Sequence, residues 1–142
     1  MRQTPFDHLS DTQLLALAIY GEARGESGEG KIAVGSVILE RVKRGGWWGK
    51  TVREVILKPF QFSCFLEKDP NYGKLVHISD QWDEVMALNA AMDDCYGIAA
   101  GLLDGSIKPN VTATLYHTDA VDTAWDDKMK LVATIGAHKF YA

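Results

Sequence analysis

The strongest candidate for chemistry in this chain is the segment Tyr20–Glu26, which holds two glutamates, an arginine and two glycines. Glu22 follows an apolar run that is typical of a helix. Glycine in a helix interior costs about 1 kcal/mol relative to alanine. The glycines on either side of Glu22 therefore indicate a backbone that bends or allows a close approach. A glutamate at such a break is a candidate general acid, because an apolar setting favours the protonated carboxyl group.

Hydrolysis of a glycosidic bond by two carboxylates needs a second acid, about 5–5.5 Å away for retention and about 6.5–9.5 Å away for inversion. In a continuous helix Glu26 would share a face with Glu22, but Gly25 leaves that geometry open. No motif marks any acid as this partner, and the candidates are Glu26, Glu29, Asp119 and Asp122.

Sites that bind sugars also need aromatic surfaces and polar donors. The chain offers Trp47, Trp48, Phe60, Gln61, Phe62, Tyr116 and His117 in expected loops or at strand ends. Each aromatic ring could equally belong to the core. Tyr116 and His117 are neighbours on an expected strand, so only one of them can face a given cleft.

Helices are expected first along the chain. Ser10 and Gln13 form a capping box that opens a helix ending near Arg24. A second helix follows the turn 27–30 and stops at 43–46, and a third begins at Thr51 and is limited by Pro59. We expect an irregular stretch over 60–65, a polar loop over 66–78 and the longest helix over about 81–103.

Strands are expected last, over 111–117, 131–135 and 138–141, with a loop at 119–129. The pattern predicts an α+β domain that is mostly helical and has a small antiparallel sheet near the C-terminus. At 142 residues the chain fits a single catalytic domain over 1–142.

The net charge of −4 argues against a partner such as duplex nucleic acid. No segment reads as a signal peptide or a membrane span, so we expect synthesis in the cytoplasm. Cys95 fits a buried free thiol; a disulfide with Cys64 stays open, and nucleophilic use of Cys64 would need a nearby base.

Five stretches together resemble the cell-wall hydrolase family that includes the spore cortex-lytic enzymes of the SleB/CwlJ type. They are Tyr20–Glu26, Gly30 with the helix ending Glu40-Arg41-Val42, Val55–Ser63 around a Gln-Phe pair, Ala113–His117 followed by Trp125, and Ala133–Tyr141. The resemblance runs from about residue 14 to 141 with the motifs in order.

This resemblance implies a lysozyme-like or lytic-transglycosylase-like domain that acts on peptidoglycan, with Glu22 as the catalytic residue and no cofactor or metal. We expect the substrate to be bound by Trp48, Gln61, Phe62, Tyr116, His117 and Glu26. Two features depart from the family pattern: Leu115 stands where many relatives carry histidine, and the segment 66–80 is an insert that could reshape the cleft.

Because no second acid is marked, we expect a lytic transglycosylase that cleaves the MurNAc-GlcNAc bond with one glutamate. A hydrolytic muramidase is the first alternative. An N-acetylmuramoyl-L-alanine amidase is another, which would need zinc on His117, His138 and a carboxylate. A non-enzymatic glycan-binding module is a third.

The expected setting is a phage or prophage endolysin. Such a protein is a monomer that reaches the cell wall after a holin, its functional partner, permeabilises the membrane.

Overall fold

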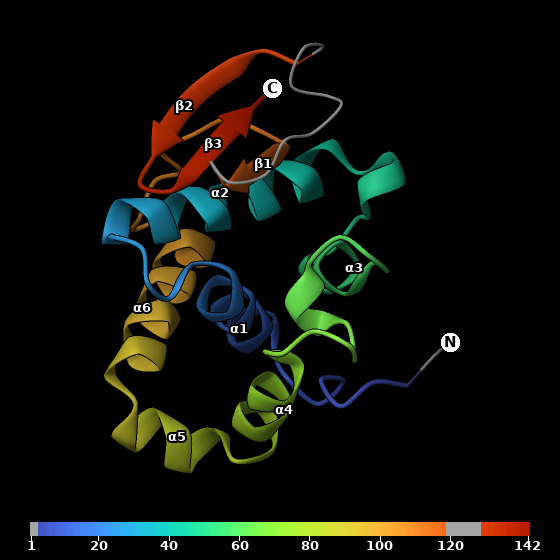
Figure 1. The fold of residues 1–142 in the computed structure, drawn as a ribbon, viewed down its shortest axis with the longest axis vertical. Coiled ribbons are helices and arrows are strands. Elements are labelled where there is room, and N and C mark those ends of the chain that lie inside the picture. The colour runs from blue at the N-terminus through green and yellow to red at the C-terminus, as the bar shows by residue number, and fades with distance from the viewer. Residues whose placement is uncertain (1–2, 119–128) are drawn as a thin grey trace.

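The structure is a computed structural model that describes residues 3–118 and 129–142. Its centre is α1 (Asp11–Ala23), which the other helices surround (Figure 1). The predicted capping box is present, with Ser10 and Gln13 each accepting a hydrogen bond from the other's backbone N–H. Every residue from Leu14 to Ile19 is fully buried, as expected of a helix that is apolar on all sides.

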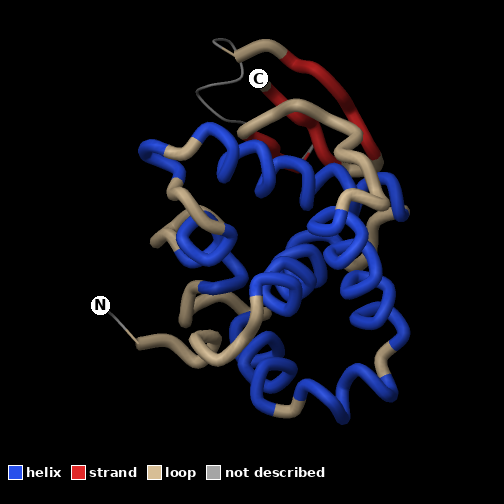
Figure 2. Tube along the Cα trace, turned by 180° about the vertical axis from the view of Figure 1, so that it is seen from behind, coloured by secondary structure: helices blue, strands red, loops and turns tan. Residues whose placement is uncertain are grey.

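α2 (Gly28–Arg44) lies between α1 and the sheet, as both views of the molecule show (Figures 1 and 2). Ser27 caps its first turn, and Gly45, with φ of +63°, ends it. Ile38 belongs to the large helical core, whereas Ala33 and Val37 pack with Phe140 in a smaller cluster beneath the sheet. The broad apolar face of this helix therefore serves two cores.

A short region of small elements follows: η1 (Gly46–Trp48), α3 (Val52–Leu57) and η2 (Ser63–Phe65). The Thr51 side chain accepts the Glu54 N–H as predicted. The Glu54 carboxylate, however, accepts from Lys50 rather than from Thr51, so the second half of this capping box is shifted by one residue.

The second half of the helical region differs from the prediction. The expected polar loop over 66–78 is wrong, because α4 (Tyr72–Asp80) occupies it and buries Leu75 and Ile78. The expected long helix is two helices, α5 (Trp82–Leu88) and α6 (Ala90–Asp104). They separate at Asn89, whose side-chain oxygen accepts the Met92 N–H at 3.0 Å and thereby starts a new helix.

The three strands form one antiparallel sheet in the order β1-β3-β2. They are β1 (Leu115–Thr118), β2 (Leu131–Ile135) and β3 (His138–Tyr141). The first strand begins four residues later than predicted, since Ala113 is buried against α2 before the sheet begins. The mostly helical α+β fold with a small C-terminal sheet is confirmed.

Both cysteines are buried free thiols, which confirms the expectation for Cys95. Burial raises the pKa of the Cys95 thiol to about 11. Within the described ranges, no helix is long and apolar enough to cross a membrane.

Candidate active site

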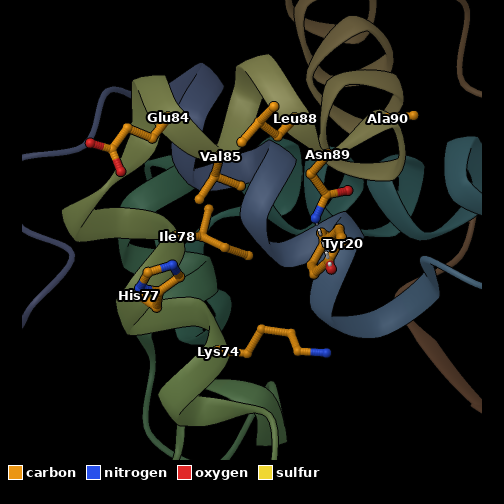
Figure 3. A pocket seen from close by; sticks show the side chains of 9 residues that line it. All are labelled: Tyr20, Lys74, His77, Ile78, Glu84, Val85, Leu88, Asn89 and Ala90. Atoms are coloured by element: carbon orange, nitrogen blue, oxygen red, sulfur yellow. Dashed lines mark hydrogen bonds between the residues drawn. The ribbon is translucent and has the colours of Figure 1, made fainter.

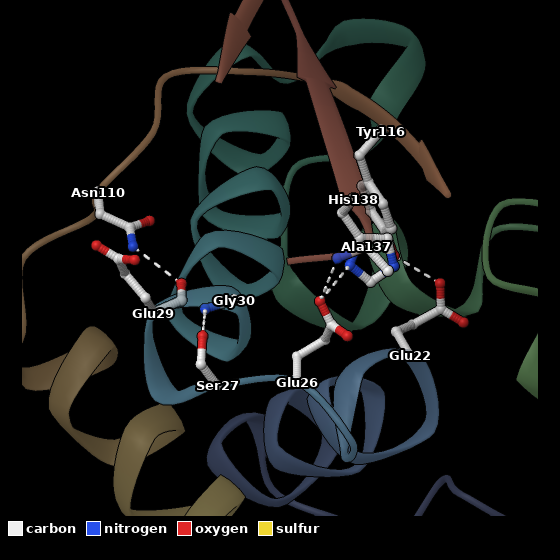
Figure 4. A network of polar contacts seen from close by, with 9 residues as sticks. All are labelled: Glu22, Glu26, Ser27, Glu29, Gly30, Asn110, Tyr116, Ala137 and His138. Carbon is white, nitrogen blue, oxygen red and sulfur yellow. Dashed lines mark hydrogen bonds and ion pairs between the residues drawn. The ribbon is translucent and has the colours of Figure 1, made fainter. Parts of the chain in front are cut away.

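Glu22 lies on the last turn of α1 and faces the sheet (Figure 4). The Tyr116 hydroxyl donates a hydrogen bond of 2.5 Å to Glu22 Oε1. This contact joins residues 94 positions apart in the chain. Charge-assisted O–H···O⁻ bonds of this length are among the stronger ones in proteins. The structure thus brings together two of the residues that the sequence analysis singled out.

Tyr116 is held in place by the side chains on its own face of the sheet. Its ring packs on Phe140 at 5.6 Å and on His138 at 5.2 Å between centroids. Burial, then the neighbouring Glu22 carboxylate, raises the pKa of the Tyr116 phenol well above its usual value. The phenol therefore stays a neutral donor toward Glu22 across the physiological pH range.

His117, the next residue on β1, faces the other side of the sheet, as strand alternation requires. Its ring stacks on Tyr141 at 5.3 Å, and its Nε2 lies 3.1 Å from the Tyr141 hydroxyl. Of the two neighbours, Tyr116 is the one that reaches Glu22.

Arg41 is a member of the site that the sequence analysis missed. Its side chain is buried, and its Nε donates to the Thr114 carbonyl at 2.8 Å. Burial lowers the pKa of Arg41, and the neighbouring Tyr116 and Glu22 act in the opposite direction, so the guanidinium lies in the electrostatic field of the Glu22 carboxylate. Its Nη1 is buried without a hydrogen-bond partner among the described residues.

A signal for Arg41 was present in the sequence. Arg41 follows Val34, Val37 and Ile38 by seven, four and three residues, so it falls on the apolar face of α2. A charged residue on such a face is rarely buried unless other groups compensate it. That observation would have pointed to a buried partner.

The expected substrate-binding aromatics are arranged around Arg41. The guanidinium carbon lies 4.3 Å from the centre of the half-buried Trp48 ring and 5.1 Å from the centre of Phe62. Phe62 is only 2% exposed, so its ring supports Arg41 from within the core. Gln61, between the two phenylalanines, is half-buried.

α1 continues through Gly21 and Glu22 without the expected break, and Cys64 packs against Gly21 in its last turn. A Cβ added at Gly21 would lie 2.7 Å from Cys64 Sγ, so the glycine is needed for this thiol to approach the helix. Burial, and secondarily the Glu22 carboxylate, raises the pKa of the Cys64 thiol far above its usual range. Cys64 is therefore a poor nucleophile. Its proximity to the Glu22 carboxylate was not expected from the sequence.

Glu26 is not on the helix with Glu22, because α1 ends at Ala23. Its carboxylate accepts the Ala137 N–H at 3.0 Å and lies 3.6 Å from Nδ1 of the buried His138 (Figure 4). These contacts hold the β2–β3 turn, where Gly136 has φ of +56°. Within this structure Glu26 therefore anchors the turn beside the site.

The zinc alternative required His117 and His138 to converge. The register pairs Thr118 with His138 and His117 with Lys139. Directly paired residues share a face, so the two histidines point to opposite faces of the sheet. The described part of the chain holds no group of three potential metal ligands. The remaining candidates Asp119 and Asp122, and also Trp125, lie outside the described residues.

A separate groove of about 550 Å³ lies between α1 and the α4–α6 helices (Figure 3). It is lined by Tyr20, Lys74, His77, Ile78, Glu84, Val85, Leu88, Asn89 and Ala90. Tyr20 and Glu22 are two residues apart, or about 200° around a helix, so this groove opens on the opposite side of α1 from Glu22.

Known proteins match this chain in sequence and in structure. A spore cortex-lytic enzyme of Halalkalibacterium halodurans is 30% identical over 132 residues, which is 92% of this chain and 34% of that protein. One of Oceanobacillus iheyensis is 48% identical over 55 residues, which is 39% of this chain and 20% of that protein. The chain thus spans about a third of the length of the first relative and a fifth of the second.

Two solved structures match nearly the whole chain. The catalytic domain of the germination-specific lytic transglycosylase SleB from Bacillus anthracis has a TM-score of 0.68 at 25% identity, covering 96% of this chain and 98% of that one. The catalytic domain of the Bacillus cereus SleB protein has a TM-score of 0.62 at 26% identity, covering 99% and 98%.

The sequence profile of the cell wall hydrolase family matches residues 25–141. This range begins just after Glu22, so the match does not test the prediction that Glu22 is catalytic. The family resemblance drawn from the motifs is confirmed, and the chain belongs to the cell wall hydrolase family.

Proposed function

We propose that this domain is a lytic transglycosylase that cleaves the MurNAc-GlcNAc bond of peptidoglycan, with Glu22 as its one catalytic carboxyl group. The observation that carries the proposal is the 2.5 Å contact between the Tyr116 hydroxyl and Glu22 Oε1, beside the buried Arg41. The two SleB catalytic domains support it through the likeness of the fold, since one of them is described as a lytic transglycosylase.

In the described part of the chain, the residues around Glu22 favour chemistry with a single carboxyl group. Glu26, the acid nearest in sequence, is occupied by the Ala137 N–H and lies next to His138. Glu29 is exposed, and its side chain lies on the far side of Glu26 from Glu22 (Figure 4). A double-displacement or inverting hydrolase needs a second free carboxylate facing the bond.

The proposed reaction has two proton transfers by the same residue. Protonated Glu22 gives its proton to the glycosidic oxygen as the bond from that oxygen to C1 of MurNAc breaks. The Glu22 carboxylate then takes the proton of the MurNAc 6-hydroxyl, whose oxygen bonds to C1. This attack is intramolecular, so the proximity advantage belongs to the substrate itself. The products are a free 4-hydroxyl on GlcNAc and a 1,6-anhydro ring on MurNAc.

Tyr116 and Arg41 act through position and charge. The phenol hydrogen bond fixes the direction of the Glu22 carboxyl group, which must reach one particular oxygen. The guanidinium stabilises negative charge on Glu22 once it has given up its proton, because opposite charges attract more strongly in a site with little water.

Digestion of purified peptidoglycan followed by mass spectrometry tests the proposal. Anhydro-muropeptides are the expected products. Products that carry only reducing-end muramic acid would instead identify a muramidase, and free stem peptides would identify an amidase.

Glu22→Gln is expected to abolish cleavage with an unchanged melting temperature. The matched control is Glu84→Gln, the same change on the exposed surface of α5, which should keep full activity. Residual cleavage by Glu22→Gln above a hundredth of the parent rate would show that another group supplies the proton.

The biological setting stays a prediction. Expression of the chain in a bacterial host with and without a holin tests the endolysin role, in which lysis depends on the holin.

A further inference from the structure

Phe60 has a backbone conformation that its residue type disfavours. Among the described residues it is the one non-glycine residue with a positive φ, +65°. Pro59 precedes it, and the Gln61 N–H donates to the Lys58 carbonyl at 3.3 Å. Proline at the second position, positive φ at the third and this hydrogen bond match a type II turn, whose third position normally holds glycine. A phenylalanine there is strained.

The strain is not compensated by burial. The Phe60 side chain is 81% exposed, whereas Phe62 two residues later is buried. An aromatic ring in solvent contributes little to folding, so neither the turn nor the core explains why position 60 carries one. Strained residues of this kind concentrate at ligand-binding sites.

Trp47 on the neighbouring loop is also exposed, at 64%. It lies in a segment that Gly45, Gly46 and Gly49 shape with φ values of +63°, +58° and +121°. The Lys58 ammonium lies 4.4 Å from the centre of the Trp47 ring, so the two loops meet. Among the large apolar residues described as exposed, Trp47 and Phe60 are the two aromatic ones, and both belong to this pair of loops.

Each exposed ring has an inward neighbour in the candidate active site. Trp47 packs edge-on against Trp48 at 5.0 Å, and Trp48 lies against Arg41. Phe62, the inward neighbour of Phe60, lies against the same guanidinium from its own side. Each loop thus places one ring against Arg41 and carries a second ring that is exposed to solvent.

We propose that Trp47, Phe60 and the Lys58 ammonium form a binding platform for the glycan strand beyond the sugars that are cleaved. The inference rests on the proposed function. Its occupant is a hexosamine ring whose C–H face covers an aromatic ring, and the ammonium suits the free carboxylates of the stem peptide that the glycan strand carries. The sequence analysis expected Phe62 to bind the substrate, but Phe62 is buried, and we assign that contact to the exposed Phe60 instead.

The key variant is Phe60→Gly, because glycine removes the ring and relieves the turn at the same time. We expect its melting temperature to equal or exceed that of the parent. In the inactive Glu22→Gln background, sedimentation with purified sacculi should show binding about tenfold weaker, the loss expected when one aromatic anchor is removed. Trp47→Ala should weaken binding similarly, and Phe60→Trp should keep it.

Kinetics on soluble glycan strands give a second readout. Loss of a contact remote from the bond should raise KM about tenfold and leave kcat within twofold, because such a contact is equal in the ground and transition states. The control is Leu88→Ala, which removes a side chain that is 90% exposed in the groove on the other side of α1 and should change neither quantity.

The outcomes separate the two proposals. If the Glu22→Gln parent does not bind sacculi, the proposed function fails and the platform fails with it. If the parent binds and Phe60→Gly binds equally well, the platform alone is refuted. Sedimentation velocity in which Phe60→Gly converts a dimer to a monomer would show that the rings contact a second copy of the chain instead, and would also overturn the platform.

Discussion

Removal of the Tyr116 hydroxyl group measures directly how much its hydrogen bond to Glu22 contributes to the rate of cleavage. Tyr116→Phe deletes the 2.5 Å hydrogen bond to Glu22 and keeps the ring contacts with Phe140 at 5.6 Å and His138 at 5.2 Å. The Glu22 carboxyl group then rotates freely and finds the glycosidic oxygen less often.

The size of the loss follows from the kind of bond removed. A hydrogen bond to an ionised group contributes about 1.5–3 kcal/mol. If that energy serves to position Glu22 in the transition state, kcat falls roughly 10- to 150-fold, at about 1.36 kcal/mol for each factor of ten. Glu22 is only half-buried, so water replaces the phenol in the ground state, and the melting temperature should change by a few degrees at most.

The assay is release of labelled fragments from sacculi, with kcat and KM measured on soluble strands and the melting temperature measured in parallel. Tyr141→Phe is the matched control, because it removes the same atom from the other face of the same sheet. A Tyr116→Phe enzyme within twofold of the parent in kcat would refute the positioning role. A large fall in melting temperature would show that the hydroxyl acts on folding instead.

Three further results follow from the same region. Arg41→Lys should lower both activity and stability, the latter by about 2–4 kcal/mol, because lysine cannot bond the Thr114 carbonyl while stacking between two rings; urea unfolding and fragment release measure the two effects. Gly21→Ala should destabilise the fold by about 1–3 kcal/mol through contact with Cys64, and a second change, Cys64→Ala, should restore part of the loss in a double-mutant cycle. The free energy of unfolding should fall as pH rises above about 8.5, because burial raises the pKa of both Cys64 and Cys95 in the folded state and only the unfolded thiols ionise there. By pH 10 each thiol should lower this free energy by about 2 kcal/mol. Cys64→Ala should abolish the part of the pH dependence that Cys64 causes.

Local signals were enough for the parts of the fold that depend on neighbouring residues. The capping box at Ser10 and the glycine turn at Gly136 each involve residues a few positions apart, and both elements are where the sequence predicted them. The alternation of Tyr116 and His117 also follows from the strand itself. Such features can be read from residues that are close together in the sequence.

The predictions of secondary structure were wrong where tertiary contacts or a single side chain determine the local structure. The segment of α4 is polar enough to resemble a loop, and it is helical because Leu75 and Ile78 pack against the core. Asn89 lies within a continuous apolar pattern, so its capping of α6 is invisible to periodicity. The sequence could not tell which of Phe60 and Phe62 is buried and which is exposed. Both are phenylalanines in the same short segment, so residue type and spacing favour neither assignment.

The site itself explains why its members were found unequally. Glu22 was visible because a carboxylate between glycines is unusual in any fold, whereas Arg41 is visible only once its burial is known. Arg41 is buried with an Nη1 that has no hydrogen-bond partner among the described residues, and the loop that holds Phe60 at positive φ also places Phe62 against the Arg41 guanidinium. Side chains cap the N-termini of α1, α2, α3 and α6, so the sequence supports local stability elsewhere, and unfavourable features at one site indicate selection for something other than stability. Glu22 and Tyr116 lie beside Arg41, so the glycan-strand binding proposed for this region would account for both the unfavourable features and the chemistry.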